Sequence, residues 1–304
     1  MATRTKKRFR IGIFPLVNGL IMLLLCSLFL FPIFHVVFTS VSDTVSIASG
    51  KVLIWPIGFE LQGYRYLLAK PEILTAYANT ILYALLSMAA TLFVTVLTAY
   101  PLSQKKLFGR TGLTMFFAVT MFFSGGLIPT YLVMRQLHLI NKIWSIILPS
   151  AFSMWYVVIT RTTFQQIPES LAESARIDGA NHFVILSRIV LPLSKSILAA
   201  VALFTIVRQW NDYFHPMIYL SDTKLMPLQV VLRNFIAPVT GGSDREMQAE
   251  MKAFTSASAG ISALGFREML RTAAMTISIG PVVLAYPFLQ RYFIKGILVG
   301  SIKG

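Results

Sequence analysis

The chain has 304 residues, of which 56% are hydrophobic and only 13% charged, and its formal net charge at pH 7 is +15. A soluble domain usually carries about 25% charged residues, so the composition excludes an ordinary soluble protein and predicts a single polytopic membrane domain, 1–304. Lys and Arg lie mainly between apolar runs, which explains most of the positive charge, so nucleic acid is not an expected partner.

Six apolar runs are predicted to cross a lipid bilayer as helices, because a span needs about 20 residues. They cover residues 12–38, 76–99, 113–134, 143–161, 195–220 and 272–293. The first run follows the basic stretch Arg4 to Arg10, as in a signal peptide, but it exceeds 25 residues and lacks a small-residue cleavage site. We therefore expect an uncleaved first span, with the single Cys26 inside it and no intrachain disulfide.

The distribution of Lys and Arg predicts the orientation of these spans. With the N-terminus in the cytoplasm, the inside segments hold more Lys and Arg than the outside segments, although they are shorter in total. This bias is the usual signature of the cytoplasmic side. Both termini are therefore expected in the cytoplasm, the segment 166–192 with them, and the segment 221–270 is expected outside.

The second and third predicted spans contain polar features. In the third, Ser124, the glycine pair that follows it and Pro129 interrupt the apolar run and predict a broken or kinked helix, a secondary candidate for lining a transport pathway. The second carries a stripe of small hydroxyl residues and one tyrosine: Thr80, Tyr83, Ser87, Thr91, Thr95 and Thr98. Small residues at this spacing let helices approach closely, so helix packing is favoured over a wet lining.

The segment 166–192 is too polar to span a membrane and predicts two short amphipathic helices. Pro168 suits the first helical position, and Gly179 suits the left-handed position just past a helix end. The apolar side of the first helix is predicted to be Ile167, Leu171, Ala172 and Ala175, and that of the second Phe183, Leu186 and Ile189, with Pro192 ending it. An interfacial linker is the alternative that local physics leaves open.

The spacing inside this segment resembles a known family motif. Glu173-Ser174-Ala175, three residues, Gly179, nine residues and Ile189-x-Leu191-Pro192 are similar to the EAA motif of ATP-binding-cassette (ABC) importer permeases, except that Ser174 replaces the usual Ala. The stretches 122–150 and 208–220 and the C-terminal "YPFLQRYFIKGILVGSIKG" resemble the smaller permease subunit of carbohydrate importers. They look closest to permeases for complex, uronate-containing oligosaccharides, such as alginate importers.

The resemblance implies an all-α, type I importer permease of six spans in a bacterial plasma (inner) membrane, with a cytoplasmic coupling-helix loop. The chain contains no phosphate-binding loop, and by the resemblance ATP and Mg are bound by two separate ATPase subunits, so the chain is not itself an enzyme. Further implied partners are a second homologous permease and an extracytoplasmic sugar-binding protein, which the outer loop 221–270 is expected to reach.

The resemblance also implies which residues couple this chain to the ATPase subunits. They are Glu173, Ser174, Ala175, Asp178, Gly179, Ile189, Leu191 and Pro192.

The fifth predicted span carries the candidate substrate pathway. Their spacing predicts a single polar stripe on this helix, formed by Arg208, Asn211, Asp212, His215 and Tyr219. Charged residues in spans usually face a bundle interior or a wet cavity, but an Arg208–Asp212 pair, or an Arg at the membrane edge, remains an alternative. Trp210 and Tyr213 are candidates for stacking on sugar rings, with packing as their alternative.

The arginine and the resembled subfamily together favour an acidic, uronate-type cargo such as an alginate oligosaccharide. A neutral sugar or polyol is the alternative cargo, and a secondary transporter or channel is the more distant alternative function. An intramembrane enzyme is disfavoured, because the sequence lacks a metal-ligand cluster, an H-E-x-x-H motif and a nucleophile elbow.

Overall fold

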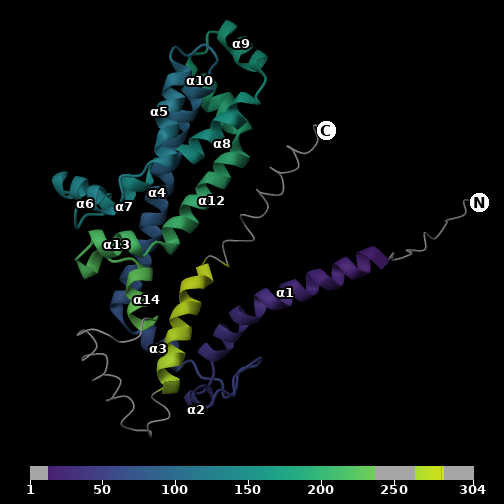
Figure 1. The fold of residues 1–304 in the computed structure, drawn as a ribbon, viewed down its shortest axis with the longest axis vertical. Coiled ribbons are helices and arrows are strands. Elements are labelled where there is room, and N and C mark those ends of the chain that lie inside the picture. The colour runs from purple at the N-terminus through teal and green to yellow at the C-terminus, as the bar shows by residue number, and fades with distance from the viewer. Residues whose placement is uncertain (1–12, 237–263, 282, 284–304) are drawn as a thin grey trace, which may run out of the picture. The chain divides into compact units, whose positions relative to one another are not determined.

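The computed structural model describes residues 13–236, 264–281 and 283, and its fold is all-α, as predicted (Figure 1). No strand occurs within these ranges. The chain divides into two compact units: one comprises residues up to Ala69 together with Phe235–Ile277, and the other comprises Lys70–Asn234 and the residues from Ser278 onward.

The first unit contains α1 (Ile13–Ser40), α2 (Thr44–Ala48), α3 (Gln62–Leu68) and a helix that is described from residue 264. No residue of the most apolar stretch of α1 is buried, as expected for a helix that faces lipid. Two glycines allow close packing in this unit: Gly63 lies against Met269, and a Cβ on Gly265 would overlap the backbone of Thr44.

The second unit is built around α4 (Pro71–Ser103), which contacts several of the helices that follow it (Figure 1). These helices are α5 (Arg110–Phe122), α6 (Leu127–Gln136), α7 (Trp144–Ser150), α8 (Met154–Gln165), α9 (Glu169–Ile177), α10 (His182–Ile185), the π-helix η1 (Leu186–Val190), α11 (Leu191–Leu193), α12 (Lys195–Asn211), α13 (Phe214–Tyr219), the 3₁₀-helix η2 (Thr223–Leu225) and α14 (Leu228–Ile236). The helices α4, α5, α8 and α12 run alongside one another, and α9 and α10 lie at one end of them.

The predicted count of six spans is not confirmed. Among the described residues, α1 and α4 are each long and apolar enough to cross a membrane, and two strongly bent helix pairs raise the number to at most four. The predicted break in the third span is present: α5 and α6 are bent by 113°. Gly126 has a φ of +81° at this break, a conformation that favours glycine.

Two other predicted spans are divided. The run 143–161 forms α7 and α8, separated at residues 151–153. The run 195–220 is not one helix, because α12 ends at Asn211 and Asp212 is extended, with φ −78° and ψ 109°. Pro216 explains this break, since its ring would clash with the carbonyl of Asp212 in a continuous helix and it has no N–H to donate to that carbonyl. The polar stripe predicted on one helix is therefore wrong as a helical stripe.

Parts of two predictions lie outside the described residues. The predicted last span, 272–293, is helical over residues 272–281 and at 283, and the rest of it is not described. Residues 237–263 of the predicted outer loop, and the N-terminal basic stretch, are also outside the described ranges.

The hydroxyl stripe on α4 is a packing surface, as favoured by the sequence. Thr80, Ser87, Thr91 and Thr95 are each at most 2% exposed. Ser87 and Thr91 bond to groups outside α4, namely the side chain of Gln209 on α12 and the carbonyl of Ser150. Small side chains with such bonds let α12 and α7 approach α4 closely.

Candidate functional site

The helix α9 ends in the left-handed turn that the sequence predicts. Gly179 follows the last turn of α9 with a φ of +81°. Its N–H donates to the carbonyl of Arg176, and the N–H of Ala180 donates to that of Ala175 at 2.8 Å. This pair of bonds is the Schellman pattern, which satisfies carbonyls at the helix end. At the other end, Pro168 immediately precedes the helix, one position earlier than predicted.

The inner face of α9 differs in part from the predicted stripe. Ile167, Ala172 and Ala175 pack against a buried cluster that includes Val157 and Phe164. Leu171 belongs to the predicted stripe but is 44% exposed. Because the inward side chains of α9 are alanines, this helix lies close to the bundle and directs its larger apolar side chains outward.

The second helix of the pair is longer and more irregular than predicted. Asn181 caps it by accepting a hydrogen bond from the N–H of Val184. The chain then passes through the π-helix η1 and α11, which ends at Leu193, and it bends by 79° before α12, so the helix ends one residue after the predicted Pro192. The N–H of Leu191 reaches back to the carbonyl of Leu186, and this wider turn brings the chain to Pro192 without breaking the helix. Phe183 is 74% exposed and so does not belong to the buried side.

The eight predicted coupling residues fall into two groups. Ala175, Ile189 and Leu191 pack against the buried cluster, so they attach the helix pair to the bundle. The remaining five are exposed: Glu173, Ser174, Asp178, Gly179 and Pro192. Two large apolar residues are exposed beside them, with Ile177 at 87% and Phe183 at 74%. We call this outward face, composed of Glu173, Ser174, Ile177, Asp178, Gly179 and Phe183, the α9 surface.

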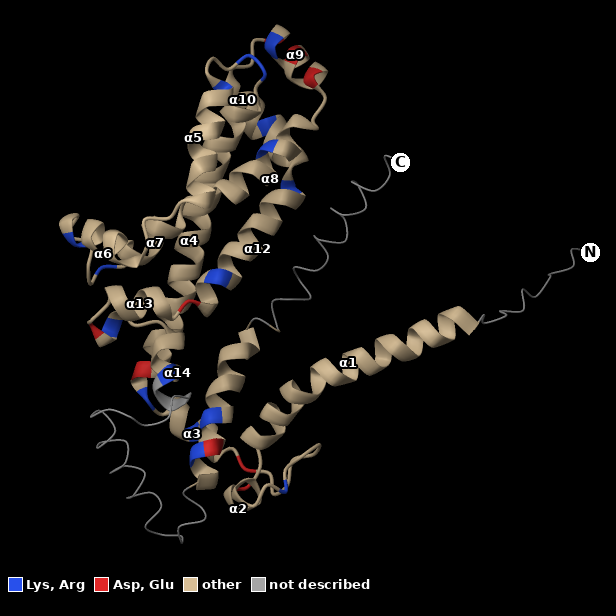
Figure 2. Ribbon diagram, viewed as in Figure 1, with Lys and Arg blue, Asp and Glu red and all other residues tan. Residues whose placement is uncertain are grey.

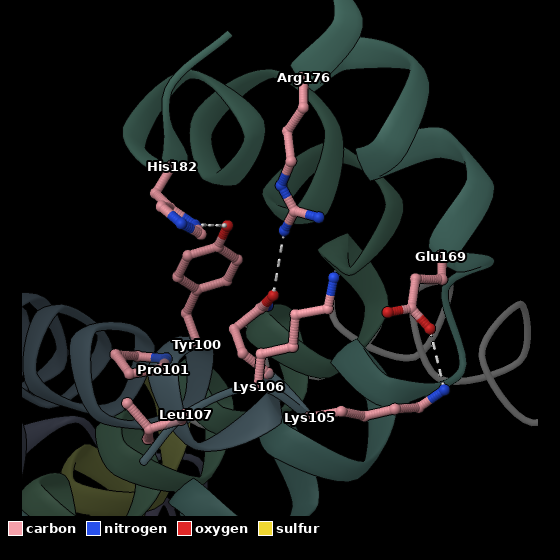
Figure 3. A pocket seen from close by; sticks show the side chains of 9 residues that line it. Tyr100, Pro101, Lys105, Lys106, Leu107, Glu169, Arg176 and His182 are labelled. Carbon is pink, nitrogen blue, oxygen red and sulfur yellow. Dashed lines mark hydrogen bonds and ion pairs between the residues drawn. The ribbon is translucent and has the colours of Figure 1, made fainter.

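Polar contacts join α9 and α10 to the end of α4 (Figure 3). Lys105 Nζ donates to Glu169 Oε2 at 2.9 Å, and Arg176 Nη2 donates to Gln104 Oε1 at 3.5 Å. Tyr100 Oη and His182 Nδ1 are 3.3 Å apart. The hydrogen bond and charge of Lys105 lower the pKa of Glu169, so this carboxylate is charged at neutral pH. These contacts between the end of α4 and the helices α9 and α10 are not predicted from the sequence. The pair Lys105-Lys106, directly after a long apolar helix, is the feature that could have indicated them.

Four of the six predicted pathway residues line one pocket of about 530 Å³ in the second unit: Arg208, Asn211, Asp212 and His215. The break at Asp212 redirects the chain and brings residues of α12 and α13 to this pocket, together with Ser145 and Ser150 of α7. Few charged residues lie along α4 and α12 (Figure 2). The last turn of α12 contains Arg208.

Asp212 pairs with His215 rather than with Arg208. Its Oδ2 lies 2.9 Å from His215 Nδ1, and its Oδ1 accepts the backbone N–H of the same residue at 3.2 Å. Arg208 Nη2 donates to the carbonyl of Ser150 at 3.0 Å. Among the described ion pairs there is none between Arg208 and Asp212, so the alternative of simple pairing along the helix is wrong.

The two aromatic candidates are placed differently. Trp210 is 6% exposed, packs edge-on against Tyr77 with ring centroids 5.7 Å apart, and donates from Nε1 to the carbonyl of Ser278. It is thus a packing residue in this structure. Tyr213 is 46% exposed and is not part of the pocket wall. Within the described part of the chain, no three His, Cys, Asp or Glu side chains are grouped to hold a metal ion.

No family model matches the chain, but it is similar to several known transport proteins. It is 36% identical over 291 residues to the polygalacturonan/rhamnogalacturonan transport system permease protein YtcP of Bacillus subtilis, covering 95% of this chain and 97% of that protein. It is also 36% identical over 275 residues to protein LplC of the same organism, covering 90% and 89%. Among solved structures, it is similar to a chain of a bacterial ABC transporter involved in the import of the acidic polysaccharide alginate. That match has a TM-score of 0.83 and 31% identity, and covers 96% of this chain and 100% of the other.

Proposed function

The chain belongs to the sugar ABC transporter permeases, and from this premise we propose that it is the subunit through which an acidic, uronate-type oligosaccharide passes during ATP-driven import. Permease subunits of this family are not themselves enzymes. The proposed complex adds a second permease, two ATPase subunits that bind ATP and Mg, and an extracytoplasmic sugar-binding protein. Closure of the ATPase pair then moves the α9 surface, and the helices alternate access to a central cavity.

The observation that carries this proposal is the form of the α9 surface. Glu173, Asp178 and Gly179 face away from their own bundle, while Ala175 attaches the helix to it. A helix held on one side by small residues and exposing two carboxylates and large apolar groups on the other suits a protein partner. In this family the partner at such a helix is the ATPase subunit, which agrees with the lack of a phosphate-binding loop in the sequence.

We further propose six spans, with both termini and the α9 surface in the cytoplasm. In this scheme the spans beyond α1 and α4 are the bent pair of α5 and α6, the pair of α7 and α8, the helix α12 with α13, and the helix from residue 264. Cysteines introduced at Ser187 and Lys224, both exposed, test the orientation in a Cys26→Ser background. The scheme expects Ser187→Cys to react only from the cytoplasm and Lys224→Cys only from outside; the reverse would invert every assignment of partners.

The proposed cargo rests on the charge of Arg208. Asp212 lines the same pocket and its charge opposes that of Arg208, but it bonds to His215, and no ion pair within the described residues joins it to the guanidinium. Arg208 uses one N–H group on Ser150, and its guanidinium has others that can bind a carboxylate. Polygalacturonan and alginate, named for a relative and for the structural neighbour, are both acidic polymers, which supports the same class of cargo.

The test is uptake by the complete complex in proteoliposomes with Arg208→Gln, and with Arg135→Gln on exposed α6 as the matched control. We expect Arg208→Gln to reduce acidic-oligosaccharide uptake about tenfold or more, the loss of one charge-assisted hydrogen-bonding partner. ATPase activity stimulated by the loaded binding protein should stay near the parent value. If uptake equals that of the parent, Arg208 does not contact cargo, and a neutral sugar or polyol becomes the better proposal. If ATPase activity falls equally, the bond from Arg208 to Ser150 is structural.

A further inference from the structure

A second pocket, of about 600 Å³, lies between the end of α4, the segment 104–107 and the helices α9 and α10 (Figure 3). It is lined by Tyr100, Pro101, Gln104, Lys105, Lys106, Leu107, Glu169, Arg176 and His182. The proposed transport function assigns no role to this pocket. It is separate from the pocket at Arg208, with which it shares no lining residue.

The charges around the pocket are unbalanced. Three cations, those of Lys105, Lys106 and Arg176, line it with a single carboxylate, that of Glu169. Lys105 already pairs with Glu169 at 2.9 Å, while Arg176 reaches only the neutral oxygen of Gln104 at 3.5 Å. Among the described residues Lys106 forms no hydrogen bond or ion pair, although its charge, like that of Arg176, helps to lower the pKa of the nearby Glu169.

Lys106 and Arg176, the two cations that form no ion pair within the described residues, approach the same space. Figure 3 shows the side chains of Lys106 and Arg176 extending toward one another between the segment 104–107 and α9. Two like charges that converge without a carboxylate between them repel, and an anion between them would remove that repulsion. A guanidinium and an ammonium together offer several donors to a tetrahedral oxyanion, because both bind phosphate oxygens with charge-assisted hydrogen bonds.

The rest of the pocket wall is apolar. Pro101 and Leu107 line it beside the ring of Tyr100, and Phe108, the next residue, is 97% exposed. These residues follow the end of α4, a helix long and apolar enough to span the membrane. An anionic group entering here would thus meet cations on one side and apolar surface continuous with a membrane helix on the other.

We propose that this pocket binds a phosphate group between Lys106 and Arg176, supplied by the head of an acidic phospholipid or by free phosphate. Basic pockets between membrane helices on the cytoplasmic side suit acidic lipid head groups, and the apolar wall has room for the glycerol and first methylenes. The bound anion would add a second tie between the end of α4 and α9, beside the Lys105–Glu169 pair. The anion would thereby make the attachment of the α9 surface to the bundle more rigid.

The lipid arm of the test counts phosphatidylglycerol molecules retained by the assembled complex. The complex is taken from nanodiscs of mixed phosphatidylcholine and phosphatidylglycerol, without cargo, and retention is measured by native mass spectrometry. Lys106→Gln should lower specific retention about fivefold, the effect of one cation near a membrane surface. Lys106→Arg should restore retention, and Lys195→Gln, which removes an exposed lysine outside the pocket, should leave it unchanged.

The second arm identifies the source of the phosphate. In nanodiscs of phosphatidylcholine alone, inorganic phosphate should raise the thermal midpoint of the parent, relative to chloride at equal ionic strength, and not that of Lys106→Gln. A positive lipid arm assigns the pocket to lipid, and a positive phosphate arm alone assigns it to a soluble phosphate. Equal retention by parent and Lys106→Gln, with no phosphate effect, overturns the proposal, as does an equal loss with Lys195→Gln. Neither arm depends on cargo or transport, so failure of the transport proposal would leave both results interpretable.

Discussion

Gly179 is the residue on which the α9 surface most clearly depends. Its φ of +81° lies in the left-handed region, where an L-residue costs about 1–2 kcal/mol and a β-branched one more. No atom of the described chain beyond its neighbours lies within 4 Å of the position that a Cβ would take. The space beside Gly179 is therefore open to a partner.

We predict that Gly179→Val abolishes uptake while the permease remains in the membrane. Gly179→Asn should retain most of the activity, because Asn tolerates the left-handed conformation at a helix end. Uptake by the reconstituted complex, with the permease quantified by immunoblot, measures both variants. Full uptake by Gly179→Val would show that no partner presses against this turn.

Two threonines on α4 should respond differently to the same substitution. Thr91 donates from Oγ1 to the carbonyl of Ser150 at 3.1 Å, so Thr91→Val should lower the free energy of unfolding by about 1 kcal/mol. The Oγ1 of Thr95 is buried with no hydrogen-bond partner among the described groups, so Thr95→Val should be neutral or stabilising. Thermal unfolding of the detergent-solubilised permease compares them. Equal destabilisation by both would mean that shape, not hydrogen bonding, governs the contact of α4 with α12 and α7.

At the scale of helices, local sequence predicts ends well and interior breaks less well. The end of α9 was predictable because Gly179 itself supplies the conformation required there. The break after Asn211 was not predicted, because the polar residues on both sides suggested one continuous stripe, although Pro216 carried the signal. The π turn before Pro192 was also not predicted, because no local residue pattern marks it, although the helix ends within one residue of that proline, as expected.

The break between α5 and α6 offers a matched pair of glycines. Gly126 has φ +81° and ψ 179°, a region open almost only to glycine, so Gly126→Ala should cost about 1–3 kcal/mol of stability. A Cβ on Gly125 would lie an ordinary 3.8 Å from Pro129, so Gly125→Ala should be tolerated. The thermal midpoints of the two variants, each in detergent, test this difference. A tolerated Gly126→Ala would indicate that α5 and α6 do not require this bend.

At the scale of the whole molecule, composition and periodicity were enough to predict an all-α membrane protein. The spacing of Glu173, Gly179 and Pro192 was enough to predict its family. They were not enough for contacts between distant residues. The Lys105–Glu169 pair joins positions 64 apart, and the pocket at Arg208 needs Ser145 and Ser150 from another helix. Such pairings are decided by how helices pack, which the sequence near each residue does not encode.

We propose that this chain imports cargo only as part of an ATP-driven complex. The most direct test of this proposal is uptake of a uronate oligosaccharide into proteoliposomes that contain both permeases and the ATPase subunits, with the binding protein supplied. We expect uptake that requires ATP hydrolysis, is lost with Gly179→Val, and persists when proton and sodium gradients are collapsed. Uptake by the permease without ATPase subunits, driven by an imposed ion gradient, would contradict it.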